Sequence, residues 1–234
     1  MKNDEAKKVL DELEKMDASS YHRGKSWEHC YCFFRKYKKF GKDIELTDLA
    51  ALNLGFFLAS WGMFRGSSFL LQQDYKFFVP AVEVLIQSKY DKLWEINWSR
   101  LNERERIEGI NLLFDLNDRL KEEMKKNNKS YKEPTETLIT KIIMATMGVT
   151  PAYDTYFKRG LKKSKIKKCR NFNKHSFGDL LSLCSENTEL KWIYITKRKI
   201  TGTDIIYPSM KLLDLHFWLL GYEGSKLANN KLEE

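Results

Sequence analysis

The sequence has few of the residues that normally end strands and shape tight turns. Only 12 Gly and 4 Pro occur among 234 residues, which argues against a many-stranded sheet and favours long helices joined by short loops. A hydrophobic content of 42%, with 13% aromatic residues, is typical of a chain that forms a globular core. We therefore expect an all-α fold, with at most one short β-hairpin, in which 192–196 pairs with 199–201.

The sequence also lacks a long apolar run. Arg65 and Gln72 interrupt the longest candidate, which begins at Leu49, whereas a bilayer crossing needs about 20 apolar residues. The first 14 residues are mostly Lys, Asp and Glu around Leu10 and Leu13, and they have no apolar centre of the kind found in secretion signals. These absences predict a cytoplasmic protein with no membrane partner.

Cysteine is scarce as well. The four cysteines are Cys30, Cys32, Cys169 and Cys184, and their spacing matches neither a usual zinc site nor an iron–sulfur run. We expect reduced thiols, mostly buried in the core, and we expect no metal or other cofactor.

Acidic residues are missing from one segment of the chain. Between Lys158 and Lys174 nine residues are basic and none is acidic, so this segment accounts for the whole net charge of +9. Cations that lack a counter-charge repel one another, and an anionic partner relieves that repulsion. The segment therefore predicts a nucleic-acid interface. Its expected contact residues are Lys158, Arg159, Lys162, Lys163, Lys165, Lys167 and Lys168.

Apolar residues at helical spacing predict a succession of helices. We expect them at 3–16, 26–37, 46–62, 82–90, 101–126, 135–147, 176–184 and 208–220, with a further one after the turn at 148–151. Ser26, Thr47 and Thr135 are expected at helix starts, and Gly41 and Gly221 at helix ends.

The helix at 46–62 is apolar almost throughout, which predicts a central core helix that is buried on most sides. A polar linker near residue 130 divides the chain into an N-terminal helical part, 1–130, and a second part, 131–234. We expect the two parts to pack as one compact unit.

Residues 135–163 combine two predicted helices with a short turn that contains Gly148 and Pro151. Unpaired N–H groups in such a turn, together with the dipole of the second helix, favour binding of a phosphate. We expect Gly148 and Thr150 to form a phosphate cradle. Over this stretch the chain resembles the helix-hairpin-helix DNA glycosylases, although GVTP stands where those enzymes have a turn with two glycines.

The resemblance implies an enzyme that flips a base out of double-stranded DNA and cleaves its bond to the sugar. Ala152 stands where bifunctional members carry a lysine, so a monofunctional enzyme is implied. Members also use a downstream aspartate to stabilise the positive charge on the sugar. The candidates here are Asp214 and Asp154, ahead of Asp179, and Lys211 lies on the same helical face as Asp214.

Base flipping requires aromatic side chains that stack on the extruded base. The aromatic residues that lie near turns or polar groups are Trp27, Trp61, Phe64 and Tyr153, and these form the expected base pocket. The substrate is expected to be a damaged base or a hypermodified one such as phage DNA carries, which would imply antiviral defence. We expect the enzyme to act as a monomer.

Two alternatives use other features of the sequence. The segment RGKSWEH places Arg23 and His29 six residues apart, which resembles the motif of the HEPN ribonucleases, except that Gly24 follows the arginine. In such an enzyme His29 would act as acid or base on the RNA 2′-hydroxyl, and Arg23 would hold the phosphate. A non-enzymatic DNA-binding protein would explain the basic segment without any chemistry.

Overall fold

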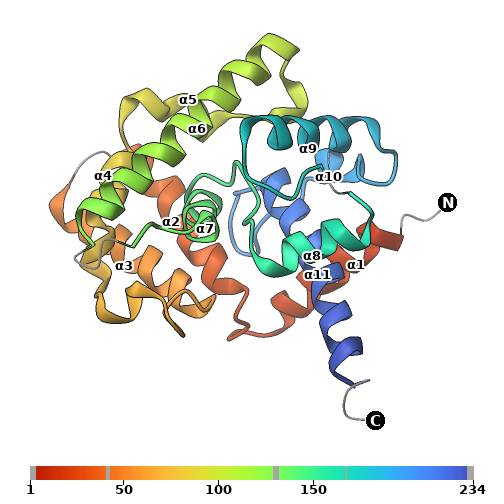
Figure 1. Cartoon of the computed structure of the whole chain (residues 1–234), viewed down its shortest axis with the longest axis horizontal. Coiled ribbons are helices and arrows are strands. Elements are labelled where there is room, and N and C mark those ends of the chain that lie inside the picture. The colour runs from red at the N-terminus through yellow and green to blue at the C-terminus, as the bar shows by residue number, and fades with distance from the viewer. Residues whose placement is uncertain (1–3, 41–42, 129–131, 167, 231–234) are drawn as a thin grey trace.

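Helices make up nearly all of the regular structure (Figure 1). The computed structural model describes residues 4–40, 43–128, 132–166 and 168–230. Within those residues no strand forms, and the one β-type pairing is an isolated bridge between Lys199 and Ile206. The prediction of an all-α fold is confirmed. None of the described helices combines the length and the apolarity that a membrane crossing requires.

The first part of the chain forms six helices among the described residues. They are α1 (Asp4–Ala18), α2 (Lys25–Phe40), α3 (Ile44–Ser60), α4 (Val79–Leu85), α5 (Asp91–Glu95) and α6 (Glu103–Lys126), with short 3-10 turns at Phe69–Gln72, Tyr75–Phe78, Ser88–Tyr90 and Trp98–Arg100. The second part forms α7 (Glu136–Thr146), α8 (Thr155–Lys163), α9 (Lys174–Glu186), α10 (Trp192–Ile195) and α11 (Ser209–Asn230).

Polar side chains cap several helix starts, where the first backbone N–H groups have no partner within the helix. The Thr135 hydroxyl caps α7, as predicted, and Asp43 caps α3 in place of the expected Thr47. The prediction for Ser26 is wrong, because this residue lies inside α2 and its hydroxyl donates to the carbonyl of Arg23. The expected helix end at Gly41 lies outside the described residues.

The central helix of the molecule is α7, which Figure 1 shows near the middle of the fold. Every residue from Leu138 to Thr146 is buried, including Lys141. The predicted central helix, α3, buries one face only, and the expectation of burial on most sides is wrong. Its large exposed apolar residues are Ile44, Leu49, Leu52 and Phe56.

The predicted strand pair is also wrong. Residues 192–195 form α10, and the bridge at Lys199 pairs with Ile206 instead. Trp192 and Ile193 are both buried, whereas neighbouring residues of a strand point to opposite faces. A helical turn therefore buries this apolar pair where a strand would expose one of its members.

Helix α8 packs along α11 (Figure 1), and two glycines allow the close approach. A Cβ atom on Gly160 would lie 1.9 Å from the carbonyl oxygen of Phe217, and one on Gly221 would lie 2.0 Å from that of Tyr156. The prediction that Gly221 ends the last helix is wrong, because α11 continues to Asn230. The glycine is there for packing and not for termination.

The two parts of the chain share one hydrophobic core. Helix α7 packs against α2 and α3, α6 packs against α9, and α1 packs against α11. The buried cluster extends from Val9 to Phe217. The four cysteines are unpaired, and among them only Cys32 is partly exposed.

Candidate functional site

The turn between α7 and α8 is buried. Gly148 adopts a positive φ of 70°, Thr150 is fully buried, and residues 147–153 are all shielded from solvent. The N–H of Ala152 donates to Oδ1 of Asp214, and the N–H of Tyr153 donates to the hydroxyl of Thr140. The predicted phosphate cradle at Gly148 and Thr150 is therefore wrong, because the turn is covered and amides within it are already bound.

A carboxylate also occupies the start of α8. Oδ1 of Asp154 accepts hydrogen bonds from the N–H groups of Tyr156 and Phe157, both at 3.0 Å. Free N–H groups at a helix start attract anions, and here an anion from the chain itself fills that position. Asp154 thus fixes α8 and leaves no room at this helix start for a DNA phosphate.

Two ion pairs, one buried and one largely buried, lie where α7, α8 and α11 meet. Nζ of Lys211 is 2.8 Å from Oδ2 of Asp214, one helical turn away on α11. Nζ of Lys141 is 3.4 Å from Oδ2 of Asp154 and 3.4 Å from the carbonyl oxygen of Trp61. We call Lys141, Asp154, Lys211 and Asp214 the buried quartet. Asp214, Asp154 and Lys211 were predicted as catalytic candidates, and the fold brings them together with Lys141.

Burial and charge oppose each other in the quartet. Burial raises the pKa of Asp214, while the neighbouring ammonium of Lys211 acts to lower it. Burial lowers the pKa of Lys141, and the carboxylates of Asp154 and Asp214 act to raise it. Each buried charge therefore depends on its partners, because a charge left unpaired in the core costs several kcal/mol.

Three cationic side chains lie near the ring of Trp61. The guanidinium of Arg23 is 4.7 Å from the ring centroid, and Nζ of Lys141 and Nζ of Lys211 are each 5.5 Å from it. Nζ of Lys211 also lies 5.4 Å from the ring of Trp27. At these distances the negative face of an aromatic ring attracts a cation. The two tryptophans thus help to hold Lys211 in place.

An aromatic cavity of about 760 Å³ lies next to this cluster, between α1, α2 and α11. Its walls include Trp27, Trp61, Tyr207, Trp218 and Tyr222, with Tyr21 and Arg23 in the loop before α2. Among the residues of the buried quartet, Lys211 alone lines the cavity. The volume lies within the range of about 300–1,000 Å³ that is usual for small-molecule sites.

The wall beside Trp27 is held from behind. Its indole N–H donates to the carbonyl of Met144 in α7 at 3.2 Å, and its ring stacks on Tyr31 and Tyr207. The Tyr207 hydroxyl donates to the buried carboxyl of Glu28. Burial raises the pKa of Glu28. This wall is therefore packed and hydrogen-bonded before any ligand arrives.

The structure brings two of the four residues predicted for the base pocket to this cavity. Trp27 and Trp61 line the cavity. Phe64 does not, because it packs against Phe78, and Tyr153 is fully buried in the core.

Three aromatic residues of the wall, Tyr207, Trp218 and Tyr222, are not among those predicted for the pocket. Trp218 and Tyr222 lie 7 and 11 positions after Lys211. This spacing places all three on one face of a helix, so a helical projection of the segment could have found them.

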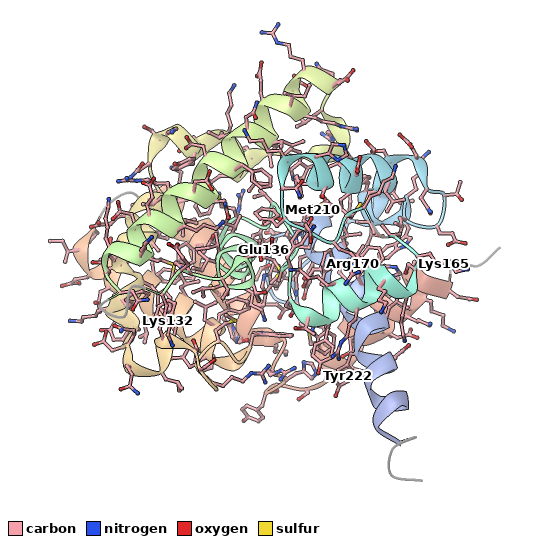
Figure 2. All side chains as sticks on the ribbon, viewed as in Figure 1. Lys132, Glu136, Lys165, Arg170, Met210 and Tyr222 are labelled. Carbon is pink, nitrogen blue, oxygen red and sulfur yellow. The ribbon has the colours of Figure 1, made fainter. Side chains whose placement is uncertain are left out.

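The exposed basic surface begins beside this cavity. The ring of Tyr156 in α8 contacts Trp218 and Tyr222 of the cavity wall, with centroid distances of 5.4 and 5.5 Å. The guanidinium of Arg159 lies 5.7 Å from the ring of Tyr156. Figure 2 labels Lys165 on the connection from α8 to α9 and Tyr222 on α11. A chain of contacts thus joins the cavity to the basic segment.

Most of the predicted contact residues in this segment face solvent. The exposed ones are Arg159, Lys162, Lys163, Lys165 and Lys168. Lys158 is different, because its ammonium pairs with Glu136 at 2.5 Å. Lys167 lies outside the described residues.

Comparison of the chain with protein-family models, curated proteins and solved structures gives no significant match.

The residues of the ribonuclease alternative are not brought together at the cavity. Arg23 lines it, whereas His29 is an exposed residue of α2 that is not part of its lining. Within the described part of the chain, no three His, Cys, Asp or Glu side chains are grouped as metal ligands would be.

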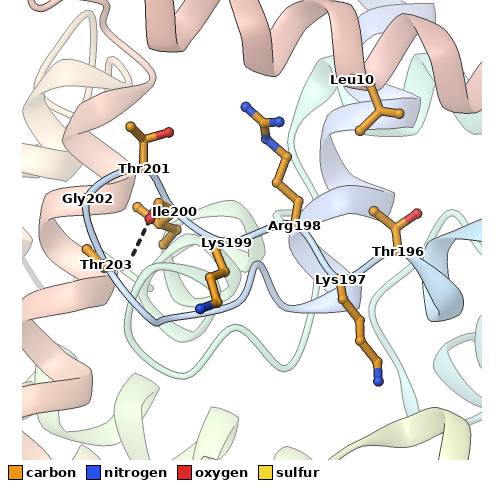
Figure 3. Close-up of a pocket in the computed structure, with 9 residues that line it drawn as sticks. All are labelled: Leu10, Thr196, Lys197, Arg198, Lys199, Ile200, Thr201, Gly202 and Thr203. Atoms are coloured by element: carbon orange, nitrogen blue, oxygen red, sulfur yellow. Dashed lines mark hydrogen bonds between the residues drawn. The ribbon is translucent and has the colours of Figure 1, made fainter.

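A second cavity, of about 620 Å³, lies between Leu10 of α1 and the loop 196–203. Figure 3 shows Arg198 directed toward α1, and Lys197 and Lys199 directed away from it. Arg198 pairs with Asp17, and Lys199 pairs with Asp204 at 2.7 Å. Two of its cations are thus already neutralised, and no aromatic side chain is among the residues that line it.

Proposed function

We propose that this protein is a DNA glycosylase that binds double-stranded DNA through its basic segment and removes a damaged or modified base. One observation carries the proposal. Lys211, whose ammonium is ion-paired to Asp214, lines an aromatic cavity, and Trp218 in the wall of that cavity contacts Tyr156 of the basic helix α8. This combination would provide the three things that base excision requires: phosphate binding, a stacking pocket and a charge at the reacting bond.

The aromatic walls would hold the extruded base. Stacking on aromatic rings contributes about 1–3 kcal/mol per base, and the partly exposed Trp61 and Trp218 offer rings in the cavity wall. The exposed cations of α8 would bind phosphates next to the flipped nucleotide and release counterions on doing so. DNA recognition would thus combine a strand bound on the surface of α8 with a base bound inside the aromatic cavity.

Lys211 would act on the base as it leaves. When the N-glycosidic bond breaks, its electron pair passes to the base, and a hydrogen bond from the Lys211 ammonium would stabilise that charge. Water then supplies a hydroxyl to C1′ of the sugar, and its remaining proton neutralises the base. The products are a free base and an abasic sugar, with Lys211 unchanged.

Asp214 would serve as a positioning residue in this scheme. One of its oxygens binds Lys211 and the other accepts the N–H of Ala152, so both are engaged within the protein. Ala152 has no amine that could attack the sugar. We therefore propose hydrolysis without a lyase step, and borohydride should trap no covalent protein–DNA adduct.

The proposal is tested on end-labelled duplexes that each carry one uracil, hypoxanthine, 8-oxoguanine, alkylated adenine or phage-type modified base, with unmodified DNA and RNA alongside. Protein-dependent strand breaks after alkali would report abasic sites. Lys211→Met should lower the excision rate roughly 100- to 1,000-fold, as expected on loss of a transition-state donor. Lys199→Met removes an exposed lysine that does not line this cavity and should leave the rate unchanged.

Three results would contradict the proposal. Binding of DNA without product on any substrate would indicate a non-enzymatic binding protein. Direct scission of RNA that is lost in His29→Ala would favour the ribonuclease alternative. An adduct trapped by borohydride in the wild type and absent in Lys211→Met would show that Lys211 attacks the sugar, so the hydrolytic scheme would be wrong.

A further inference from the structure

The loop between α1 and α2 presents an aromatic side chain to solvent at the cavity. Tyr21 is 97% exposed, more than any other large hydrophobic residue described. It is also one of the residues that line the aromatic cavity. A single exposed aromatic residue is ordinary on a protein surface. An aromatic residue at the entrance of an aromatic cavity, however, can contact a ligand that enters the cavity.

The loop that carries Tyr21 is held by hydrogen bonds. The N–H of Ser19 donates to the carbonyl of Met16, and the N–H of Gly24 donates to Nδ1 of His22 at 3.1 Å. A Cβ atom on Gly24 would lie 2.2 Å from the sulfur of Met16, so the loop is seated closely on α1. Tyr21 therefore projects from a fixed support.

Arg23 ties the same loop to the pocket. Its guanidinium lies 4.7 Å from the centroid of Trp61 in the cavity wall, and it is two residues from Tyr21. Two residues of extended chain span at most about 7 Å. The exposed side chain of Tyr21 therefore lies close to the pocket that would receive a base.

A flipped base leaves a gap in the DNA stack, and unstacking costs a few kcal/mol unless another group fills the space. An aromatic ring suits this role because it can stack on the bases to either side. We propose that Tyr21 inserts into the duplex and fills the space that the extruded base vacates. This inference rests on the proposed function, since it assigns the residue that opens the substrate for the same cavity.

The test compares Tyr21→Ala, Tyr21→Trp and the control Phe56→Ala. Phe56 is an aromatic residue of α3 that is 61% exposed and does not line the cavity. Three quantities are measured: binding of a labelled duplex by anisotropy, the fluorescence of a 2-aminopurine that brightens when unstacked, and excision from duplex and from single strands. Circular dichroism checks folding.

Wild-type protein and Phe56→Ala should brighten the 2-aminopurine duplex. Tyr21→Ala should bind with little brightening and should excise the base from duplex roughly 10- to 100-fold more slowly. Its rate on single strands should be unchanged, because no stack has to be opened there. Tyr21→Trp should restore both brightening and duplex excision.

The inference is overturned if Tyr21→Ala brightens and excises like the wild type, or if it slows excision equally on duplex and single strands. The latter result would assign Tyr21 to the pocket itself. Brightening that requires Tyr21 without excision of any base would support the wedge and refute the glycosylase. Absence of both binding and brightening in the wild type would refute both proposals.

Discussion

Asp214 joins Lys211 to the turn between α7 and α8. Its Oδ2 lies 2.8 Å from Nζ of Lys211, and its Oδ1 accepts the N–H of Ala152 at 3.0 Å. One buried carboxylate therefore positions the only charge of the buried quartet that lines the cavity. Loss of its charge should affect both the site and the stability of the fold.

Asp214→Asn should destabilise the protein by about 3–5 kcal/mol, because removal of one partner leaves the other charge buried and unpaired. Asparagine can still accept the N–H of Ala152, so the change tests the charge. The free energy of unfolding is measured with urea. Asp204→Asn removes an exposed carboxylate that pairs with Lys199 and should leave stability unchanged.

The double variant Lys211→Met with Asp214→Asn should lose less stability than the sum of the two single variants, because each single change leaves one uncompensated charge. Additive losses would show that the pair is not coupled. Excision by Asp214→Asn should fall because Lys211 is no longer held, and Asp214→Glu should restore part of the rate. Normal excision by Asp214→Asn would contradict the positioning role.

Binding of duplex DNA should weaken steeply as salt increases, because the exposed cations of α8 would displace counterions from phosphates. Lys162→Ala with Lys163→Ala should reduce the slope of log K against log salt by about 2, since each phosphate contact contributes about 0.9. Lys125→Ala with Lys126→Ala removes the same charge from α6, where both lysines pair with glutamates. If the α6 variant reduces the slope as much as the α8 variant, the basic segment is not the DNA face.

Gly160→Ala should destabilise the protein, because the new methyl group would lie 1.9 Å from the carbonyl oxygen of Phe217. Overpacking of this kind costs typically about 1–3 kcal/mol. Gly178→Ala in α9 is the matched control, since the nearest atom lies 3.8 Å away. There the substitution should stabilise the helix by about 0.5–1 kcal/mol. Thermal unfolding monitored by circular dichroism would separate the two, and equal effects would contradict the close packing of α8 on α11.

His216 should make stability depend on pH. Burial lowers its pKa from 6.5 to about 4, with the nearby Lys8 adding to the effect. Between these two values the unfolded chain binds more protons than the folded one, so stability rises with pH from about 4 to about 6.5, by up to about 3 kcal/mol. Urea unfolding at a series of pH values measures the profile.

His216→Phe should remove that rise. Its aromatic ring can replace the imidazole beside Trp192 and Phe217. Asp214 contributes with the opposite sign, because its raised pKa lets the folded protein hold an extra proton and stability then falls as pH increases. The difference between wild type and variant isolates the histidine. An unchanged difference across the window would contradict the assignment.

Features that depend on residues close together in the chain can be predicted from the sequence. Scarce glycine and proline predicted the all-α class, and Thr135 was recognisable as a cap. The three-residue spacing of Lys211 and Asp214 placed both on one face of a helix, where they pair. Such signals are readable because helix geometry relates residues within one or two turns.

The neighbours of each helix, in contrast, depend on how the whole chain packs. The sequence predicts an accessible turn at Gly148 and Thr150, yet the rest of the fold covers this turn. Trp27 hydrogen-bonds to Met144, 117 residues away in the chain, and no local sequence pattern predicts that contact. Nothing in the sequence distinguishes Lys141 from the other lysines, and it is buried because α7 is the central helix. The cavity and its single lining lysine arise from packing between helices distant in sequence, which propensity and periodicity within one segment do not encode.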